Sequence, residues 1–213
     1  MKIFDRLTLC VAVALLAFGL TGFSNRKSSI YENMVNASVL ISDNTGGASG
    51  VFIHDNVVLT AAHVLENMNV CNIELSDGTV LKSSDIYIDT EEDVGFVFVD
   101  ADELHVAKVS LSPRDIGDTV FLVGTPHNKF FSFTLTKGIV SHLNRDLPEM
   151  GWKDLLQVDA EGGYGSSGGP LYDSDGGLIG IYVGHAGGGG VGISLCESAE
   201  SILEAYERCM DAR

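Results

Sequence analysis

Apolar and polar residues between positions 30 and 213 form many short runs rather than long helical stripes. Several runs alternate, or are rich in Val, Ile and Phe, and turn residues separate them at intervals of roughly 8–15 residues, as is typical of strands. Their number and spacing predict an all-β sandwich or barrel. The strand-like segments are 38–42, 50–62, 70–75, 78–88, 94–99, 105–111, 119–124, 130–143, 154–160, 177–183 and 190–195.

Three segments differ from this pattern. Residues 61–67 predict one short helical turn, and residues 197–211 predict a surface helix with acids on its outer face. Residues 187–190 are four glycines without the Lys-Ser/Thr ending of a phosphate-binding loop, which indicates a hairpin. The predicted inner face of the helix consists of Ile202, Leu203, Tyr206, Cys209 and Met210.

The composition is that of an ordered protein with many tight turns. The chain has 213 residues, 45% of them hydrophobic, with 25 Gly and 4 Pro, and no linker or repeat divides residues 30–213. A chain of this length buries roughly 70% of its unfolded surface, so it needs no metal or disulfide to fold. The net charge of −16 repels phosphate backbones and anionic lipids, which argues against nucleic-acid and peripheral membrane binding.

The N-terminus has the layout of an export signal. Lys2 and Arg6 precede an unbroken apolar run over 7–20, and Gly22 and Ser24 provide small residues for cleavage. We therefore expect an exported protein, periplasmic or secreted, whose residues 1–24 are either a cleaved signal peptide or an uncleaved anchor through residues 7–23. A buried core helix is the remaining alternative, and membrane contact is expected only for the anchor.

The cysteines do not predict a disulfide scaffold. Cys10 lies in the expected signal, which leaves Cys71, Cys196 and Cys209, an odd number. We expect buried reduced thiols, with a Cys196–Cys209 bridge as the alternative.

The strongest local signal for chemistry is the sequence GSSGGPL at 165–171, which lies between two strand-like segments. A serine hydroxyl needs a neighbouring base to act as a nucleophile, and N–H donors to stabilise the oxyanion that its attack creates. A glycine two residues before Ser167 permits backbone shapes that a Cβ hinders, so the N–H groups of Gly165 and Ser167 can face one point. By itself, however, the motif also fits an ordinary Gly-Ser turn.

Two further motifs supply a base and an acid. In VVLTAAHV at 57–64, an apolar strand ends in small residues and delivers His63, a general base near neutral pH. In EDVGFVFV at 92–99, Asp93 stands directly before an apolar strand, where it could orient the histidine. Taken alone, His63 also fits a structural histidine and Asp93 a turn residue, and Asp89 and Asp100 compete with Asp93. No HExxH or Cys/His cluster indicates a metal site.

Together these motifs resemble the trypsin-like serine proteases of the chymotrypsin fold, especially the catalytic domain of the HtrA/Deg branch. The likeness runs from about residue 48 to 195, in blocks that keep the family's order. These blocks are SGVFIHDNVVLTAAHV, IELSDGTVL, EDVGFVFVD, VGTP, TKGIVSHLNR, LLQVDA and GSSGGPLYDSDGGLIGI.

The resemblance implies a serine endopeptidase in which Ser167 is the nucleophile, His63 the base and then acid, and Asp93 the residue that orients His63. The amides of Gly165 and Ser167 would form the oxyanion hole. The implied fold is two six-stranded antiparallel β-barrels with a C-terminal α-helix. The first barrel would span about 30–108 and the second, with the helix, about 109–213, inside a protease domain at 25–213.

Three departures from the family pattern qualify this reading. Ser166 stands where relatives carry Asn or Asp, so we do not expect activation by a cleaved N-terminus. Gly95 replaces a usual alanine and is expected only to loosen packing. The 213 residues leave no room for the PDZ domain that HtrA-type proteases often append, so peptide-sensing regulation and cage assembly are not expected.

The resemblance also places a specificity pocket beside the nucleophile, with Glu161 near its floor and Tyr182 to Gly184 along its wall. A carboxylate there would favour Lys or Arg before the scissile bond, although Glu161 facing solvent is the alternative. The side chains of Tyr182 and His185 could shape the site or simply pack.

A protease fold that binds without turnover, a pseudoprotease, is the main alternative function. An esterase-like hydrolase on the same barrels is another. An α/β-hydrolase is disfavoured because its histidine comes last in the chain. The expected partners are polypeptide substrates, with no cofactor, and the substrate identity and oligomeric state are not determined by the sequence.

Overall fold

The computed structural model describes residues 30–43, 46–102, 104–127, 129–186 and 192–213. The expected export signal over residues 1–24 and the glycine tract at 187–190 lie outside these residues. No helix among the described residues is long and apolar enough to cross a membrane. Residues 33–213 form one folding unit, which is described below.

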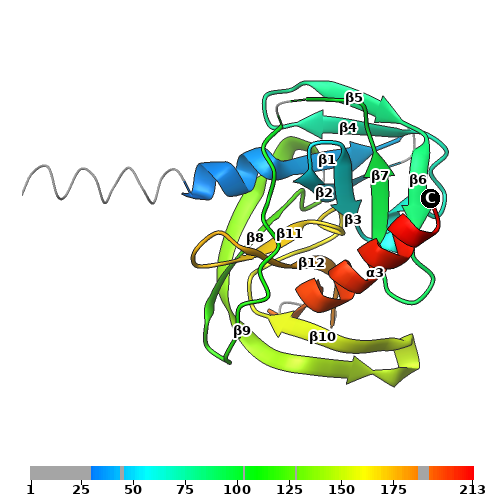
Figure 1. The fold of residues 1–213 in the computed structure, drawn as a ribbon. Coiled ribbons are helices and arrows are strands. Elements are labelled where there is room, and N and C mark those ends of the chain that lie inside the picture. Colours follow the sequence, from blue (N-terminus) through cyan, green and yellow to red (C-terminus); the bar gives the residue numbers. More distant parts are fainter. Residues whose placement is uncertain (1–29, 44–45, 103, 128, 187–191) are drawn as a thin grey trace, which may run out of the picture. The chain divides into compact units, whose positions relative to one another are not determined.

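The first sheet is antiparallel and takes its strands from the N-terminal part of this unit, in the spatial order β5-β4-β1-β2-β3-β7-β6 (Figure 1). The most buried strands, β2 and β3, lie near its centre, and β3 is buried along its whole length. The strands are β1 (Ser38–Ser42), β2 (Gly47–His54), β3 (Val57–Thr60), β4 (Cys71–Leu75), β5 (Val80–Ser83), β6 (Asp85–Ile88) and β7 (Gly95–Phe98).

The second sheet closes on itself as a six-stranded antiparallel barrel in the order β10-β13-β12-β11-β8-β9. Closure leaves no unpaired strand edge. Its strands are β8 (Thr119–Gly124), β9 (Thr134–Leu147), β10 (Trp152–Val158), β11 (Pro170–Asp173), β12 (Leu178–His185) and β13 (Ser194–Ser198). Short 3-10 turns, η1 (Lys129–Phe131) and η2 (Pro148–Met150), flank β9.

Each sheet has its own apolar core. The core of the first sheet is built from Val39, Ile41, Phe52, Val58, Leu65, Cys71, Ile73, Val97 and Val99. The core of the barrel is built from Val120, Leu122, Val140, Leu156, Val158, Ala160, Leu171, Ile179, Tyr182 and Cys196. The loops described in the next section connect strands whose positions are held by these two cores.

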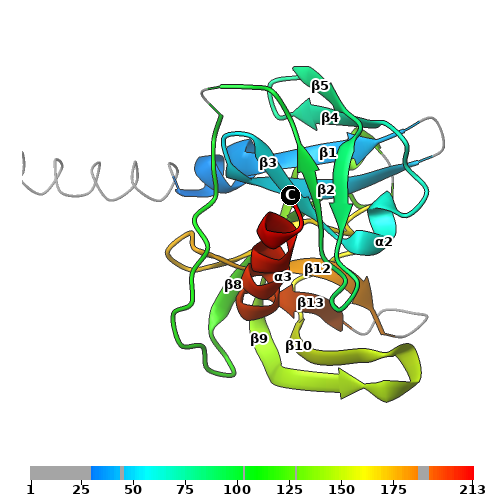
Figure 2. The same cartoon turned by 45° about the vertical axis from the view of Figure 1, so that its right-hand side comes forward.

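The two predicted helices are present with shorter bounds. Helix α2 (Ala62–Leu65) is the expected turn after β3. Helix α3 (Ala199–Asp211) is preceded by Ser198, whose hydroxyl caps the helix by accepting a hydrogen bond from the Ser201 N–H. Figure 2 shows α3 lying along β12 and β13, both of which it contacts. Met210 was expected on the inner face but is 40% exposed.

This mostly β architecture with a C-terminal helix confirms the predicted fold class, with two differences. The first sheet has seven strands rather than six. The predicted runs over 50–62 and 78–88 each divide into two strands, β2 with β3 and β5 with β6. The predicted strand at 105–111 is wrong. This segment connects the two sheets. It donates one hydrogen bond to the first sheet, from Ala107 N–H to Phe52 O, and forms one isolated parallel bridge to Leu178 of β12.

The three cysteines in the described part of the chain, Cys71, Cys196 and Cys209, are free and buried. This matches the reduced-thiol expectation rather than a Cys196–Cys209 bridge. Burial raises the pKa of all three thiols, which makes them poor nucleophiles.

Candidate functional site

His63 lies where the first sheet turns back on itself. The buried strand β3 ends at Thr60, Ala61 is extended, and the four-residue helix α2 begins at Ala62. The His63 side chain is 41% exposed, so its ring lies at the surface while its backbone is held by buried neighbours. A partly exposed imidazole can exchange protons with a bound molecule.

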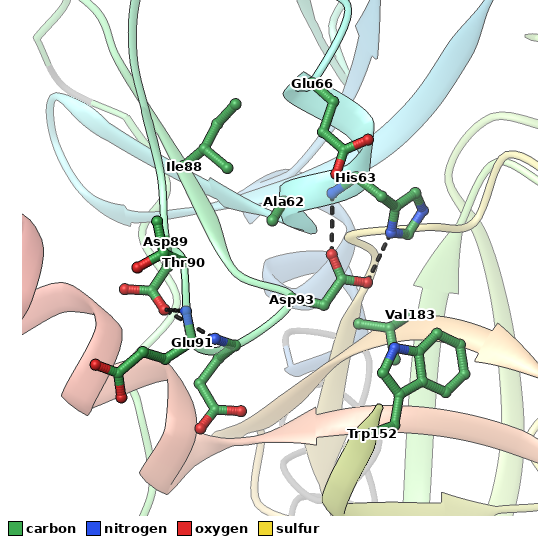
Figure 3. A pocket seen from close by; sticks show the side chains of 11 residues that line it. Ala62, His63, Glu66, Ile88, Asp89, Thr90, Glu91, Asp93, Trp152 and Val183 are labelled. Atoms are coloured by element: carbon green, nitrogen blue, oxygen red, sulfur yellow. Dashed lines mark hydrogen bonds and ion pairs between the residues drawn. The ribbon is translucent and has the colours of Figure 1, made fainter. Parts of the chain in front are cut away.

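Asp93 holds His63 by two hydrogen bonds. Its Oδ1 accepts the main-chain N–H of His63 at 2.9 Å, and its Oδ2 lies 2.7 Å from the ring Nδ1 (Figure 3). The Asp93 side chain is only 12% exposed. The hydrogen bond to Asp93 raises the pKa of His63, partly offset by burial. A carboxylate in this position fixes the ring orientation and leaves Nε2 available.

The competing aspartates lie elsewhere. Asp89 is buried and bonded to Arg208 of α3, and Asp100 is exposed after β7. The structure therefore brings Asp93, and not its two competitors, to His63. Among the three candidates, the residue directly before the apolar strand is the one that bonds to His63.

The loop before β11 leaves two N–H groups unused. The N–H groups of Ser166, Gly168 and Gly169 donate to the carbonyls of Gly163, Tyr182 and Ser166. Within the described residues, by contrast, the N–H groups of Gly165 and Ser167 donate to no acceptor. Gly165 has a φ of 91° and Gly168 a φ of 80°, which only glycine adopts readily. The loop shape therefore depends on its glycines, as the sequence predicted.

Ser166 is 1% exposed and lies against Gly124. A Cβ built on Gly124 would lie 2.8 Å from the Ser166 hydroxyl oxygen. This space accommodates a small side chain, which gives a physical reason for serine at a position where the family pattern has Asn or Asp.

The first sheet supports the Ser167 loop directly. The Ser49 N–H of β2 donates to the Ser167 carbonyl at 2.8 Å, and the Ser49 hydroxyl donates to the Gly165 carbonyl at 2.9 Å. A Cβ on Gly168 would lie 2.1 Å from Thr60 Oγ1 and 2.9 Å from the Ala61 nitrogen. The residue after Ser167 thus abuts the segment that leads into His63. No hydrogen bond joins the Ser167 hydroxyl to His63 within the described part of the chain.

The candidate pocket residues have different environments. Tyr182 is 1% exposed, and its ring lies so close to Gly162 that a Cβ there would be 2.4 Å from Tyr182 Cε2. The Tyr182 hydroxyl lies 2.9 Å from His185 Nδ1. Glu161 is exposed, and its carbonyl accepts the Thr136 hydroxyl. Tyr182 is thus a barrel-core residue that packs against Gly162, whereas Glu161 lies at the surface.

Trp152 is a site residue that the sequence analysis missed. With His63, Asp93 and Val183 it lines a cavity of about 430 Å³ (Figure 3). The end of its ring packs on Gly184, since a Cβ there would lie 2.9 Å from Trp152 Cη2. It is the single tryptophan of the chain, and that is the one signal that could have drawn attention to it.

The charged groups around this cavity are mainly acidic. Glu66, Glu91 and Glu92 line it together with Asp93, and Lys153 lies 3.6 Å from Glu92. In the described residues no group of three or more His, Cys, Asp or Glu side chains is arranged to hold a metal ion. The acids would attract cationic rather than anionic groups to the cavity.

Comparisons with known proteins agree on one family. The family described as "Trypsin-like peptidase domain" matches residues 48–181. A "probable periplasmic serine endoprotease DegP-like" from Marinomonas sp. is 32% identical over 165 residues, covering 76% of this chain and 35% of the relative. The protein of the same name from Halomonas elongata is 34% identical, covering 76% of this chain and 34% of the relative. This chain thus spans about a third of the length of these relatives.

Solved structures give the same result. The HtrA-type protease AlgW with a bound tripeptide superposes with a TM-score of 0.76 at 26% sequence identity, covering 83% of this chain and 62% of that one. A second AlgW structure, with a decapeptide, gives the same TM-score at 23% identity, which by itself supports only the fold.

Proposed function

Because the chain belongs to the trypsin-like peptidase family, we propose that it is a serine endopeptidase with the triad His63, Asp93 and Ser167. The observation that carries the proposal is the pair of hydrogen bonds from His63 to Asp93, at 2.9 and 2.7 Å. This arrangement leaves Nε2 of the ring as the only nitrogen able to take a proton from Ser167.

The proposed reaction has two halves. Ser167 Oγ attacks the scissile carbonyl carbon as His63 Nε2 takes the hydroxyl proton, and the carbonyl oxygen becomes negative. The free N–H groups of Gly165 and Ser167 donate to that oxygen. The C–N bond then breaks, His63 gives its proton to the leaving amine, and an acyl-enzyme remains. Water, deprotonated by His63, hydrolyses the ester and returns Ser167 to its free state.

Asp93 stays ionised throughout this cycle. Its carboxylate stabilises the imidazolium form of His63 that exists between the two proton transfers. The raised pKa of His63, caused chiefly by this hydrogen bond, supports that role. No cofactor or metal is needed for these steps.

For substrate choice, we propose that Tyr182 limits the pocket to small side chains before the scissile bond. Its ring covers Gly162, which lies between Glu161 and the nucleophile loop. Glu161 is exposed, so a charge pair between it and a substrate Lys or Arg would be weak and screened. Polypeptides with Gly, Ala or Ser at this position are the substrates we favour.

For location, we propose that the protein is exported, with residues 1–24 as the signal or anchor. The basic start and the apolar run over 7–20 support this. The two DegP-like relatives carry the word periplasmic in their names.

The test is hydrolysis of casein and of a peptide library by the parent protein, Ser167→Ala and Ser174→Ala. Ser174 is exposed in the turn after β11, so its variant is the matched control. We expect cleavage by the parent and Ser174→Ala but not by Ser167→Ala, and labelling of Ser167 by a phosphonylating reagent. A folded parent that neither cleaves nor reacts would contradict the proposal and favour the binding-module alternative.

A further inference from the structure

The carboxylate of Asp89 is buried and fully bonded, with 0% of its side chain exposed. Its Oδ1 accepts the main-chain N–H groups of Glu91 and Glu92, both at 2.9 Å. Arg208 of α3 donates from Nε to Oδ2 at 2.8 Å and from Nη2 to Oδ1 at 2.9 Å. Burial alone would raise the pKa of this carboxyl, but these hydrogen bonds bring it below its ordinary value.

Asp89 and Asp93 stand at the two ends of one short loop between β6 and β7. The Asp89 N–H donates to the Val94 carbonyl at 3.0 Å, and the Val94 N–H donates to the Glu92 carbonyl at 2.7 Å. The loop is thus closed on itself by main-chain bonds, and its turn is shaped around the Asp89 carboxylate. Asp89 and Asp93, which holds His63, therefore belong to one hydrogen-bonded loop.

The C-terminal helix contacts the start of this loop through Arg208. Arg208 reaches Asp89 from the last turns of α3, 119 residues away in sequence, and also lies 3.7 Å from Glu91. Glu197, two residues before the helix begins, is 2% exposed. The negative charge of Asp93 is one of the influences that raise the pKa of Glu197. Arg208 thus ties the last turns of α3 to the Asp89 end of the loop.

We propose that Arg208 is a positioning residue for the catalytic triad. By holding Asp89, it fixes the loop in the shape that aims both Asp93 oxygens at His63. Helix α3 is then part of the active-site support and not only a cover for the barrel. This inference rests on the proposed function, but the position of His63 can be followed without any substrate.

The chemistry of the pair explains why a replacement would act on the loop. Removing the guanidinium leaves the buried Asp89 carboxylate without its compensating charge, which is strongly unfavourable. The loop can relieve this cost by turning Asp89 toward water, and Asp93 then moves with it. A lysine keeps the charge but not the two-pronged geometry, so it should restore function only in part.

The chain offers a matched control on the same helix end. Arg213 makes a two-pronged pair with Asp85, with both hydrogen bonds at 2.8 Å, at the surface where the Asp85 side chain is 54% exposed. Asp85 begins β6 and so lies at the opposite end of that strand from the loop. Arg213→Gln removes an Arg–Asp pair of the same type without touching the residues that carry Asp93.

The experiment compares the full chain with Arg208→Gln, Arg208→Lys and Arg213→Gln. Rates are normalised to the folded fraction measured by circular dichroism. We expect Arg208→Gln to lower kcat by about 10- to 100-fold, the range in which small misplacements act, with KM changed less than about twofold. As the pH is lowered, the kcat/KM of this variant should begin to fall at a lower pH than that of the parent. The reason is that a displaced Asp93 no longer raises the pKa of His63. The kcat of Arg208→Lys should lie between those of Arg208→Gln and the parent. Arg213→Gln should have the kcat and pH profile of the parent.

A second readout is the pKa of His63 from an NMR titration of the imidazole, assigned by its loss in His63→Gln. A lower His63 pKa in Arg208→Gln than in Arg213→Gln supports the proposal even if the parent cleaves nothing. In that case the proposed function alone has failed. The same kcat and the same His63 pKa in both glutamine variants would overturn the positioning role. So would an Arg208→Gln protein that fails to fold while folded Arg208→Lys keeps parental kcat and pH dependence.

Discussion

His63 and Asp93 are joined twice, once through the main chain and once through the ring. The His63 N–H donates to Oδ1 and the ring Nδ1 lies against Oδ2, so both carboxylate oxygens serve the same residue. The main-chain bond ties the start of helix α2 to the loop, and the ring bond sets the side chain. The pair is therefore oriented even without a substrate.

The first prediction concerns this pair and pH. The pKa of His63 lies above its ordinary value of 6.5, chiefly through the hydrogen bond to Asp93, and a protonated ring cannot act as a base. The kcat/KM value should therefore fall as the pH drops through this raised pKa. Asp93→Asn should lower kcat by about 10⁴-fold and move the fall to lower pH. Initial rates across the pH range measure both effects, and an unshifted profile would argue against Asp93 as the orienting residue.

The second prediction concerns Glu197 and stability. Burial, with smaller effects of Glu92 and Asp93, raises the pKa of Glu197 from 4.5 to about 7. Below about pH 7 the folded protein keeps this carboxyl neutral, so its contribution to stability is lost as pH rises from about 4.5 to 7. The loss amounts to roughly 3 kcal/mol for a shift of this size.

Urea unfolding at several pH values tests this effect. Glu197→Gln has a neutral side chain at every pH, so its free energy of unfolding should not fall over this interval as that of the parent does. The difference between the two proteins isolates Glu197 from the other carboxylates. Parallel curves for parent and variant would show that Glu197 is ionised in the folded protein.

The third prediction concerns Gly168. It has a φ of 80°, and a Cβ would lie 2.1 Å from Thr60 Oγ1 and 2.3 Å from the Ser49 carbonyl oxygen. Gly168→Ala should abolish turnover and destabilise the fold by more than the roughly 1–2 kcal/mol that a left-handed alanine costs. Gly78→Ala is the control, since Gly78 has a φ of 86° but no atom within 4 Å of a Cβ. Thermal melts and casein hydrolysis would compare them, and equal losses in the two variants would count against a packed loop.

The fourth prediction concerns substrate choice. Tyr182→Ala should extend cleavage in a peptide library from small residues to Val, Leu and Phe before the scissile bond, because the ring no longer fills the pocket. It should also cost about 3–5 kcal/mol of stability, as do other buried aromatic deletions. Glu161→Ala should leave the library profile unchanged. A parent preference for Lys or Arg that Glu161→Ala removes would instead support the basic-pocket hypothesis.

The sequence predicted those features that depend on local pattern. The strand that leads to His63 and the glycines around Ser167 follow from apolar runs and from the need for positive φ. Position in the sequence favoured Asp93 over Asp89 and Asp100 as the partner of His63. The sequence did not show that Asp89 bonds to Arg208, because these residues are 119 positions apart. Contacts between residues far apart in the sequence also explain why the local pattern did not indicate Trp152, Glu197 and Arg208. The segment at 105–111 alternates like a strand, yet its main-chain hydrogen bonds are divided between two sheets, with one to Phe52 and an isolated bridge to Leu178.

Ser49 links the two sheets at the point where chemistry is expected. It belongs to β2, yet its N–H and hydroxyl hold the carbonyls of Ser167 and Gly165 in the barrel, 116 residues further along in the case of Gly165. The loop that holds Gly165 and Ser167 therefore adopts this conformation only after both sheets have formed and packed together. On the proposed mechanism, a partly synthesised chain that lacks the barrel would therefore be inactive.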